Sequence, residues 1–235
     1  MINSALITGA SKGIGEAIVK DLWVNHHEIE TLILVARKST NFNDLLMWLK
    51  KNNPRNKAYK NFFVDLSNRR DMLGLVENIQ ATNINIDLLI NNAGYTKPDP
   101  IHQISLGDFD RTFNVNLFAP FVLTQGLLHK GNGFQIIINI ASTAGLSGRP
   151  GWLAYSASKA ALINMSEVMR EELRLYGTRV VCLAPGRCAT DLRKKLAPDE
   201  DPSTIMQPEH VASVVSFLIT EGGRYIDSQN LVVRL

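Results

Sequence analysis

Short apolar runs alternate with longer amphipathic stretches along the chain. The apolar runs have the length of strands, and most of the stretches between them show the period of helices. Strands are expected at residues 2–8, 32–36, 58–64, 86–90, 135–140, 179–184 and 231–233. The run at 135–140 is almost unbroken, as expected for a strand that helices cover on both faces. Strands that alternate with helices through short connections predict a Rossmann-type, doubly wound parallel sheet of about seven strands.

The remaining pattern places helices between these strands. They are expected at residues 14–25, 42–51, 68–80, 106–129, 154–175 and 208–219. Pro120 is expected to interrupt the helix at 106–129, because proline has no N–H to donate to the helical ladder. Residues 187–207 are expected to be irregular, and no repeat or linker divides the chain. We therefore predict a single α/β domain over residues 1–235, a length that can bury a full core.

Charge and cysteine content narrow the function classes. The 25 basic and 22 acidic side chains are scattered and give a formal net charge of +3, which predicts no nucleic-acid or membrane partner. No apolar run approaches the length that spans a bilayer, and the N-terminus does not have the pattern of a signal peptide. The two cysteines, Cys182 and Cys188, form neither a disulfide framework nor a metal motif. We expect a soluble, cytoplasmic protein without a metal site.

A glycine-rich turn, Gly9-Ala-Ser-Lys-Gly-Ile-Gly15, joins the first strand to the first helix. This is the context of a phosphate-binding loop, because glycines let the backbone approach a pyrophosphate and helix N–H groups point at it. A glycine cluster alone is often only a turn, and the spacing here is TGxxxGxG rather than GxGxxG. The segment Asn91-Asn-Ala-Gly94, after the fourth strand, is likewise either a ligand site or a plain turn.

The end of the second strand bears on the choice of dinucleotide. An acid at this point accepts a hydrogen bond from the 2′-hydroxyl of NAD, whereas cations suit the 2′-phosphate of NADP. The chain has Ala36 followed by Arg37 and Lys38, and Lys12 in the glycine turn adds a third cation. Arg37 and Lys38 can also be read as surface charges. Three cations in one neighbourhood favour NADP(H) over NAD(H).

Tyr155 and Lys159 are four residues apart in a predicted helix, so their side chains share one face. An ammonium group beside a phenol favours the phenolate and is expected to lower the pKa of Tyr155. Such a phenol exchanges a proton with a carbonyl or alcohol oxygen, and Ser142, just after a strand, can hydrogen-bond the same oxygen. Taken alone, this spacing is usually a solvated pair; the other motifs of the chain reverse that reading.

Together these motifs resemble the short-chain dehydrogenase/reductase family over nearly the whole chain. The matching pieces are Thr8 to Gly15, Asp65-Leu66, Asn91 to Gly94, Asn116, Ser142, Tyr155 with Lys159, and Pro185-Gly186 with Thr190. Each piece is weak alone, but their common order and spacing are specific. The resemblance implies an NADPH-dependent oxidoreductase that interconverts a carbonyl and an alcohol.

The resemblance also implies a catalytic tetrad and its roles. Tyr155 would be the acid/base, and Ser142 would orient and polarise the substrate oxygen. Lys159 would lower the pKa of the tyrosine and hold the nicotinamide ribose, while Asn116 would support a water that relays protons to Lys159. The residues expected to bind the cofactor are Gly9, Ser11, Lys12, Gly13, Ile14, Gly15, Arg37, Lys38, Asp65, Leu66, Asn91, Ala93, Gly94, Tyr155, Lys159, Pro185, Gly186 and Thr190.

The chain departs from the family pattern in two places. Cys188 replaces the usual valine or isoleucine after Pro185-Gly186, and we interpret it as a small apolar substitute. The end of the chain, 227–235, lacks the glycine pair that helps many relatives complete a tetramer. A homodimer or homotetramer remains the expectation, with a dimer or monomer more plausible than in the family at large.

The residues expected to face the substrate are mostly apolar or aromatic: Tyr95, Ala144, Leu146, Trp152 and the stretch beyond Thr190. They suggest a small-molecule ketone or aldehyde with a hydrophobic or planar body. The basic run Arg193 to Lys195 is read as a solvated helix face or as a contact for an acidic carrier protein. A 3-oxoacyl-carrier-protein reductase is therefore an alternative function. A non-catalytic NADP(H) sensor or scaffold is the other.

Overall fold

Seven strands form one parallel sheet in the order β3-β2-β1-β4-β5-β6-β7. The computed structural model describes residues 2–53, 55–226 and 230–235. The strands are β1 (Ser4–Thr8), β2 (Thr31–Ala36), β3 (Ala58–Phe63), β4 (Leu88–Asn91), β5 (Ile136–Ile140), β6 (Arg179–Pro185) and β7 (Asn230–Val233). The fold class predicted from the sequence is confirmed.

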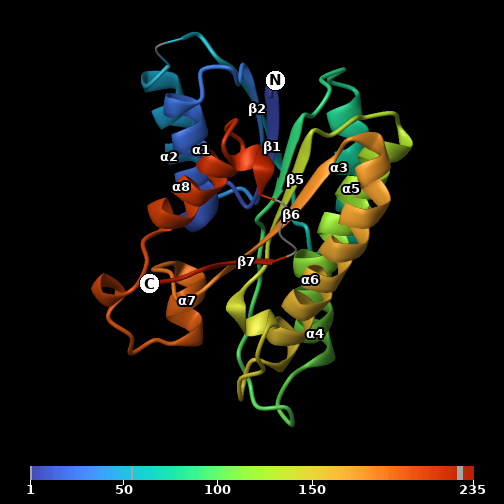
Figure 1. Ribbon diagram of the computed structural model, residues 1–235. Helices are drawn as coiled ribbons and strands as arrows, with labels where there is room; N and C mark the ends of the chain where they lie inside the picture. Colours follow the sequence, from blue (N-terminus) through green and yellow to red (C-terminus); the bar gives the residue numbers. More distant parts are fainter. Residues whose placement is uncertain (1, 54, 227–229) are drawn as a thin grey trace.

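Helices cover both faces of the sheet, with α1, α2 and α8 on one side and α3 to α6 on the other (Figure 1). Their bounds are α1 (Gly13–Asn25), α2 (Thr40–Lys51), α3 (Arg69–Gln80), α4 (Leu106–Phe113), α5 (Ala119–His129), α6 (Leu153–Leu173), α7 (Asp191–Leu196) and α8 (Pro208–Leu218). The two main apolar cores lie between the sheet and these layers. This double cover is the reason that β1, β4 and β5 are buried along their whole length.

The strand order reverses between β1 and β4. From β1 the chain proceeds outward to β2 and β3, then returns to β4 on the other side of β1 and continues to β7. At such a switch point, the connections that follow neighbouring strands leave toward opposite faces and open a crevice at the carboxyl ends. The glycine-rich turn and Asn91 to Gly94 follow β1 and β4, so the fold brings both motifs to this crevice.

Two segments differ from the sequence-based expectation. The long helix is interrupted by a π-helical turn at Asn114–Phe118, and Pro120 lies just after it, in the first turn of α5. Pro120 cannot donate to the Asn116 carbonyl four residues earlier, so the α-helical ladder breaks there, and the Ala119 N–H donates to Asn114 instead. The segment 187–207 is not wholly irregular, because it contains the short helix α7.

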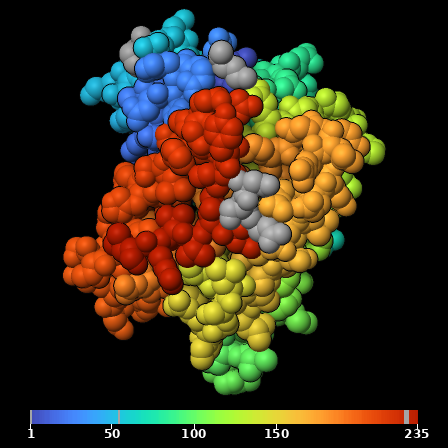
Figure 2. Space-filling view, viewed as in Figure 1, coloured from blue at the N-terminus to red at the C-terminus, as the bar shows by residue number. Residues whose placement is uncertain are grey.

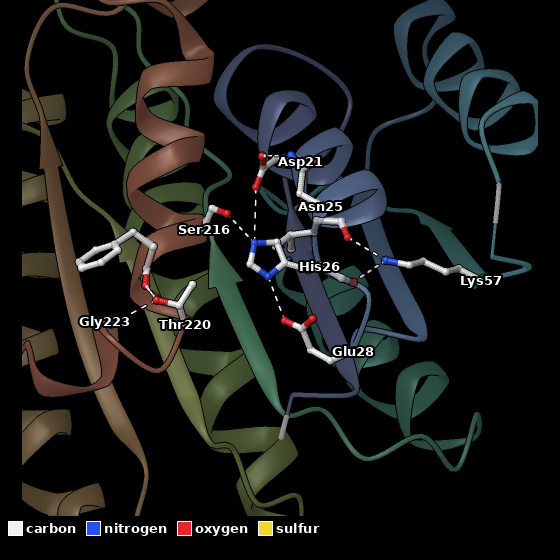
Figure 3. A network of polar contacts seen from close by, with 10 residues as sticks. Asp21, Asn25, His26, Glu28, Lys57, Ser216, Thr220 and Gly223 are labelled. Atoms are coloured by element: carbon white, nitrogen blue, oxygen red, sulfur yellow. Dashed lines mark hydrogen bonds and ion pairs between the residues drawn. The ribbon is translucent and has the colours of Figure 1, made fainter.

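At the amino ends of β2 and β3, a polar network ties α1 to α8 (Figure 3). His26, just after α1, contacts Ser216 of α8 through Nε2 and Glu28 through Nδ1, the latter at 2.9 Å. The ammonium group of Lys57 donates to the Leu22 and His26 carbonyls, at 3.0 and 2.6 Å, and so satisfies the end of α1.

None of the described helices is long and apolar enough to cross a membrane.

Candidate active site

A cleft of about 490 Å³ lies at the carboxyl ends of the strands, where the strand order reverses. It contains most of the residues predicted from the sequence. Those that line it are Gly9, Ser11, Lys12, Gly13, Ile14, Arg37, Asp65, Leu66, Ala93, Gly94, Ser142, Tyr155, Lys159, Pro185, Gly186 and Thr190. Gly15, Lys38, Asn91 and Asn116 do not line it. The sheet thus gathers side chains from seven separate motifs into one site.

The glycine-rich turn is packed too closely for larger residues. A Cβ atom on Gly15 would lie 2.2 Å from the Gly9 carbonyl oxygen and 2.5 Å from Nδ2 of Asn92. That amide of Asn92 donates to the carbonyls of Thr8 and Gly9 and holds the turn against the end of β4. Gly15 therefore serves the shape of the loop and lies outside the cleft. Asn92, omitted from the predicted site residues, is a loop-supporting residue that lines it.

The start of α1 is open to the cleft. The residue at its N-cap, Lys12, makes no side-chain capping bond, and Ser11, Gly13 and Ile14 line the cleft beside it. The first backbone N–H groups of a helix have no intrahelical acceptor, and they carry the positive end of the helix dipole. An uncapped glycine turn at the cleft therefore suits the pyrophosphate of a dinucleotide.

The predicted cluster of three cations is only partly assembled. Arg37 lines the cleft at the end of β2, beside Ala36, but Lys38 does not. Lys12 forms a 2.6 Å ion pair with Asp191 of α7, on the other side of the glycine turn. The predicted cluster of three free cations is therefore wrong, because Lys38 lies outside the cleft and the Asp191 carboxylate engages Lys12. Of the three cations, Arg37 and Lys12 line the cleft, and Lys12 is paired with a carboxylate.

Asp65 lies in the cleft after β3. Its Oδ1 accepts from the Ser67 backbone at 3.0 Å and from the Ser67 hydroxyl at 2.8 Å. Burial by itself raises the pKa of Asp65, but these hydrogen bonds, followed by the charges of Arg111 and Arg37, lower it below its usual value. The carboxylate is therefore ionised at neutral pH and can accept a hydrogen bond from a ligand.

Asn91 belongs to the sheet interior. It is buried at the end of β4, and its Nδ2 donates to Oδ1 of Asn139 on β5 at 2.8 Å. Asn139 in turn donates to the Ser166 hydroxyl of α6 at 2.9 Å. The prediction that Asn91 contacts the cofactor is not supported by this position; it links β4, β5 and α6 beneath the cleft.

Tyr155 lines the cleft and is 7% exposed, and its pKa is set by burial and by two neighbouring groups. Burial raises the pKa of the phenol, while a hydrogen bond with Ser142 and the charge of Arg193 lower it, and the net direction is upward. Gly145 makes the approach of Ser142 possible, because a Cβ there would lie 2.7 Å from the Lys159 carbonyl carbon. The turn after β5 can thus pack directly on the backbone of α6.

The expected effect of Lys159 on Tyr155 is wrong for this structure. The ammonium group of Lys159 is buried and donates to the Ile140 carbonyl at 2.7 Å. Burial lowers the pKa of Lys159 to about 8. Removal from water disfavours the charged form of each group, so the phenol titrates higher and the amine lower than in solution.

Asn116 also differs from its predicted position. It is fully buried in the π-helical turn, and it does not line the cleft. Its Oδ1 accepts from the Tyr95 N–H at 2.8 Å, and its Nδ2 donates to the Tyr95 carbonyl at 3.0 Å and the Ser158 hydroxyl at 2.9 Å. Both N–H groups of the side-chain amide are therefore used within the fold, and its oxygen holds the Tyr95 N–H. Asn116 fixes the loop after β4 against α6, the helix that carries Tyr155.

The substrate end of the cleft is more basic than the sequence suggested. Tyr95 and Trp152 line it as expected, but Ala144 is buried behind it and Leu146 is exposed outside it. Arg149 and Arg193 line it as well. Arg193 belongs to the stretch beyond Thr190 that was expected to face the substrate, whereas Arg149 was not predicted. Arg193 was read as part of a solvated face, yet its side chain is only 14% exposed. The sequence did not predict helix α7, so it also did not predict that one face of α7 turns toward the cleft.

The segment after β6 closes the remaining side of the cleft. Thr190 caps α7 by accepting from the Arg193 N–H at 3.1 Å. Cys188 is buried against Met206 and Val211, and burial raises its pKa to about 11. Its interpretation as a small apolar residue agrees with this environment, since the reactive thiolate form is disfavoured.

Comparison with known proteins agrees with this architecture. A family model described as short chain dehydrogenase matches residues 3–201. A 3-oxoacyl-(acyl-carrier-protein) reductase of Rickettsia bellii is 33% identical over 98% of this chain and 94% of its own length. A solved structure of a 4-hydroxyisoleucine dehydrogenase mutant, complexed with NADH and succinate, has a TM-score of 0.84 at 27% identity and covers 98% of this chain and 96% of that one. A blue fluorescent protein from a metagenomic library, in complex with NADPH, has a TM-score of 0.83 at 28% identity with the same coverage of 98% and 96%.

Proposed function

The chain belongs to the short-chain dehydrogenase/reductase family of oxidoreductases, which act on alcohol or carbonyl groups, and on that premise we propose that it reduces a ketone or aldehyde with NADPH. The observation that carries the proposal is the position of Tyr155. Its buried phenol lines a cleft that also holds an open helix start, with Ser142 hydrogen-bonded to it and Lys159 one helical turn away. A proton donor, an orienting hydroxyl and a dinucleotide-sized groove thus share one cavity.

The cleft suits a nicotinamide dinucleotide. The open start of α1 would take the pyrophosphate, Asp65 the adenine, and Gly94 the adenosine ribose. Lys159 would hold the nicotinamide ribose, and Thr190 the carboxamide. When bound, the cofactor supplies the hydride for the carbonyl carbon. Lining residues from the carboxyl ends of six strands, β1 to β6, support this assignment, because an extended dinucleotide contacts several strand ends.

The chain's own residues would handle the proton. Tyr155 gives its phenolic proton to the carbonyl oxygen, and its raised pKa keeps the phenol protonated at neutral pH until then. Ser142 orients the same oxygen by a hydrogen bond. Lys159 is the proton source that lies nearest along α6, and its pKa of about 8 is close to working pH. Asn116 acts as a positioning residue through the Tyr95 loop and Ser158.

Residues 1–235 are proposed to work as one domain, in the cytoplasm, as a homodimer or homotetramer. Continuity of the sheet from β3 to β7 supports a single unit. Two buried free cysteines suit a reducing compartment.

Of the two rival functions, only the acyl-carrier reductase has specific support. The Rickettsia relative is a reductase of acyl-carrier substrates, which favours 3-oxoacyl thioesters as the substrate class. A cofactor sensor without catalysis needs only the dinucleotide groove, so the buried Tyr155–Ser142 pair weighs against it.

The proposal is tested by following NADPH consumption against ketones, aldehydes, oxo acids and 3-oxoacyl thioesters. We expect turnover with at least one carbonyl class, and alcohol formed in equal amount to the NADPH consumed. Tight NADPH binding without turnover on any class contradicts the reductase and favours the sensor.

Replacement of Arg37 by Asp tests the dinucleotide preference. We expect NADPH affinity to fall about ten- to a hundred-fold more than NADH affinity, because a charge-assisted contact to the 2′-phosphate becomes a repulsion. Binding is measured by fluorescence titration with each dinucleotide. Lys38→Asp makes the same change of charge at a residue outside the cleft and should cost less. Equal losses for both dinucleotides in Arg37→Asp would mean that Arg37 does not read the phosphate.

A further inference from the structure

Two arginines line the substrate end of the cleft, and neither is among the sequence-predicted catalytic or cofactor residues. We propose that Arg149 and Arg193 bind a carboxylate of the substrate, so that the enzyme acts on oxo acids and the matching hydroxy acids. The inference deepens the proposed function and rests on it, because it takes Tyr155 as the point where the carbonyl is reduced. It replaces the hydrophobic ketone or aldehyde that the sequence suggested.

Arg193 reaches the cleft from α7. Its guanidinium carbon lies 5.6 Å from the centre of the Trp152 ring, and that ring meets the Tyr155 ring edge-on at 6.4 Å. The positive charge of Arg193 acts on Tyr155 itself, as one of the influences that lower the pKa of the phenol. A substrate whose carbonyl contacts Tyr155 therefore has a guanidinium group within reach across one tryptophan ring.

Arg149 reaches the same ring from the loop after β5. Its guanidinium carbon lies 5.1 Å from the centre of the Trp152 ring. Among the described residues, no carboxylate lies within 4.0 Å of its guanidinium group. The loop with Arg149 and the segment that follows β6 lie on either side of the C-terminal residues on the molecular surface, yellow and orange in Figure 2. Both arginines line the one cleft.

The charge balance at this end of the cleft favours an anion. Arg193 and Arg187 share a single acid, Glu200, so the two cations together have one negative charge. The Arg149 charge has no counterpart among the described acids. Asp191, an exposed acid two residues before Arg193 on α7, is paired with Lys12. A substrate carboxylate would supply the negative charge that this end lacks.

The contact with Glu200 shows the kind of group to which Arg193 can donate. Its Nε lies 2.5 Å from Oε2 and its Nη2 lies 2.8 Å from Oε1, a forked pair that matches a planar carboxylate. Because Arg193 is only 14% exposed, its partner must be small enough to enter the cleft. An acidic carrier protein would instead meet the exposed Lys194 and Lys195 on the outer face of α7. The geometry therefore favours a small oxo acid over a carrier.

The test compares each oxo acid with its methyl ester, which removes the charge and keeps the carbonyl. In the wild-type protein we expect kcat/KM to be about ten-fold or more higher for the acid. Arg149→Gln and Arg193→Gln should each abolish most of that preference, which is measured as the acid-to-ester ratio because the ratio cancels the effect of the Arg193 charge on Tyr155. Lys194→Gln removes one charge from the same helix and should keep the preference. Glu200→Gln also breaks the ion pair of Arg193 but retains its guanidinium, so it too should keep the preference.

Three results would overturn the inference. One is an acid-to-ester ratio near one in the wild-type protein, and another is a ratio that neither arginine variant changes. The third is a loss of the acid preference that is equal in Glu200→Gln and Arg193→Gln, with no change of that preference in Arg149→Gln. The Arg193–Glu200 ion pair would then act only on the fold of α7. Arg149 lies on an exposed loop, so Arg149→Gln keeps the test valid if Arg193→Gln fails to fold.

Binding separates this inference from the proposed function. Glutarate, which has no carbonyl to reduce, is titrated into the NADPH complex by calorimetry, with its dimethyl ester as the control. We expect glutarate alone to bind, and binding to weaken about ten-fold or more in both arginine variants. If no carbonyl compound turns over but this pattern holds, the reductase fails and the carboxylate site stands. If turnover is found and glutarate binds no better than its ester, the carboxylate site fails and the reductase stands.

Discussion

Replacement of Tyr155 by Phe is expected to lower kcat/KM for carbonyl reduction by about 10²- to 10⁴-fold, the usual contribution of a positioned general acid. The substitution removes only the hydroxyl group, so the ring keeps its edge-on contact with Trp152 and its place in the core. Ser142 keeps its role as acceptor for the Ala144 N–H at 3.1 Å. Steady-state rates and NADPH titration are measured on the same preparation, and NADPH affinity should remain close to that of the wild type.

Tyr225→Phe is the matched control for this experiment. Tyr225 is 78% exposed and lies outside the cleft, so loss of its hydroxyl should leave both rate and affinity unchanged. Full activity in Tyr155→Phe would contradict the assignment of Tyr155 as the proton donor. A fall in NADPH affinity as large as the fall in rate would show instead that Tyr155 acts by holding the cofactor.

Replacement of Lys159 by Met is expected to abolish turnover while changing how stability depends on pH. Burial lowers the pKa of Lys159 in the folded protein from 10.5 to about 8. Below about pH 8 the amine is charged in both the folded and unfolded chains, so folding must desolvate a charge. Between about pH 8 and 10.5 the folded chain binds fewer protons than the unfolded chain, and stability therefore rises with pH. At about 1.4 kcal/mol per pH unit, the rise is about 3 kcal/mol.

Methionine has no such titration, which makes the difference between the two proteins the quantity to measure. The free energy of unfolding is determined by denaturant titration of the wild type and Lys159→Met at several pH values from 7 to 10.5. The wild type should gain about 3 kcal/mol on the variant across this window. Tyr155, Cys182 and Cys188 also titrate at high pH, but they are present in both proteins and largely cancel. A constant difference would show that Lys159 is not desolvated as its burial implies. The absolute difference at pH 7 is a weaker readout, because methionine leaves the Ile140 carbonyl without its 2.7 Å donor.

The Tyr155→Phe and Lys159→Met experiments both depend on the burial of these two side chains. The ammonium of Lys159 donates to the Ile140 carbonyl. The pKa of the Tyr155 phenol is set mainly by burial, Ser142 and Arg193. Proton transfer from Tyr155 is then favoured by a positive charge in the cleft beside it. Arg193 supplies such a charge, in addition to the larger effect of Ser142, and it belongs to the proposed carboxylate site.

The sequence by itself determined the layers of the fold and the chemistry of its site. Periodicity identified the strands and most helices within a few residues, because fully buried parallel strands are apolar along their length. The order of β1, the glycine turn and α1 predicted the phosphate loop, and the spacing of Tyr155 and Lys159 placed both on one face of α6. These features depend on neighbours in the chain, so local patterns reveal them.

The tertiary structure alone decided what surrounds each predicted side chain. It turned Asn91 into the sheet and Asn116 onto the Tyr95 loop, and it paired Lys12 with Asp191. It also folded α7 so that Arg193 faces Trp152, a residue 41 positions earlier in the chain. The direction of the Tyr155 pKa was wrong for the same reason, since burial outweighs a neighbouring charge only when the packing around both groups is known. Contacts between distant segments set the electrostatics of the cleft, and no local pattern contains them.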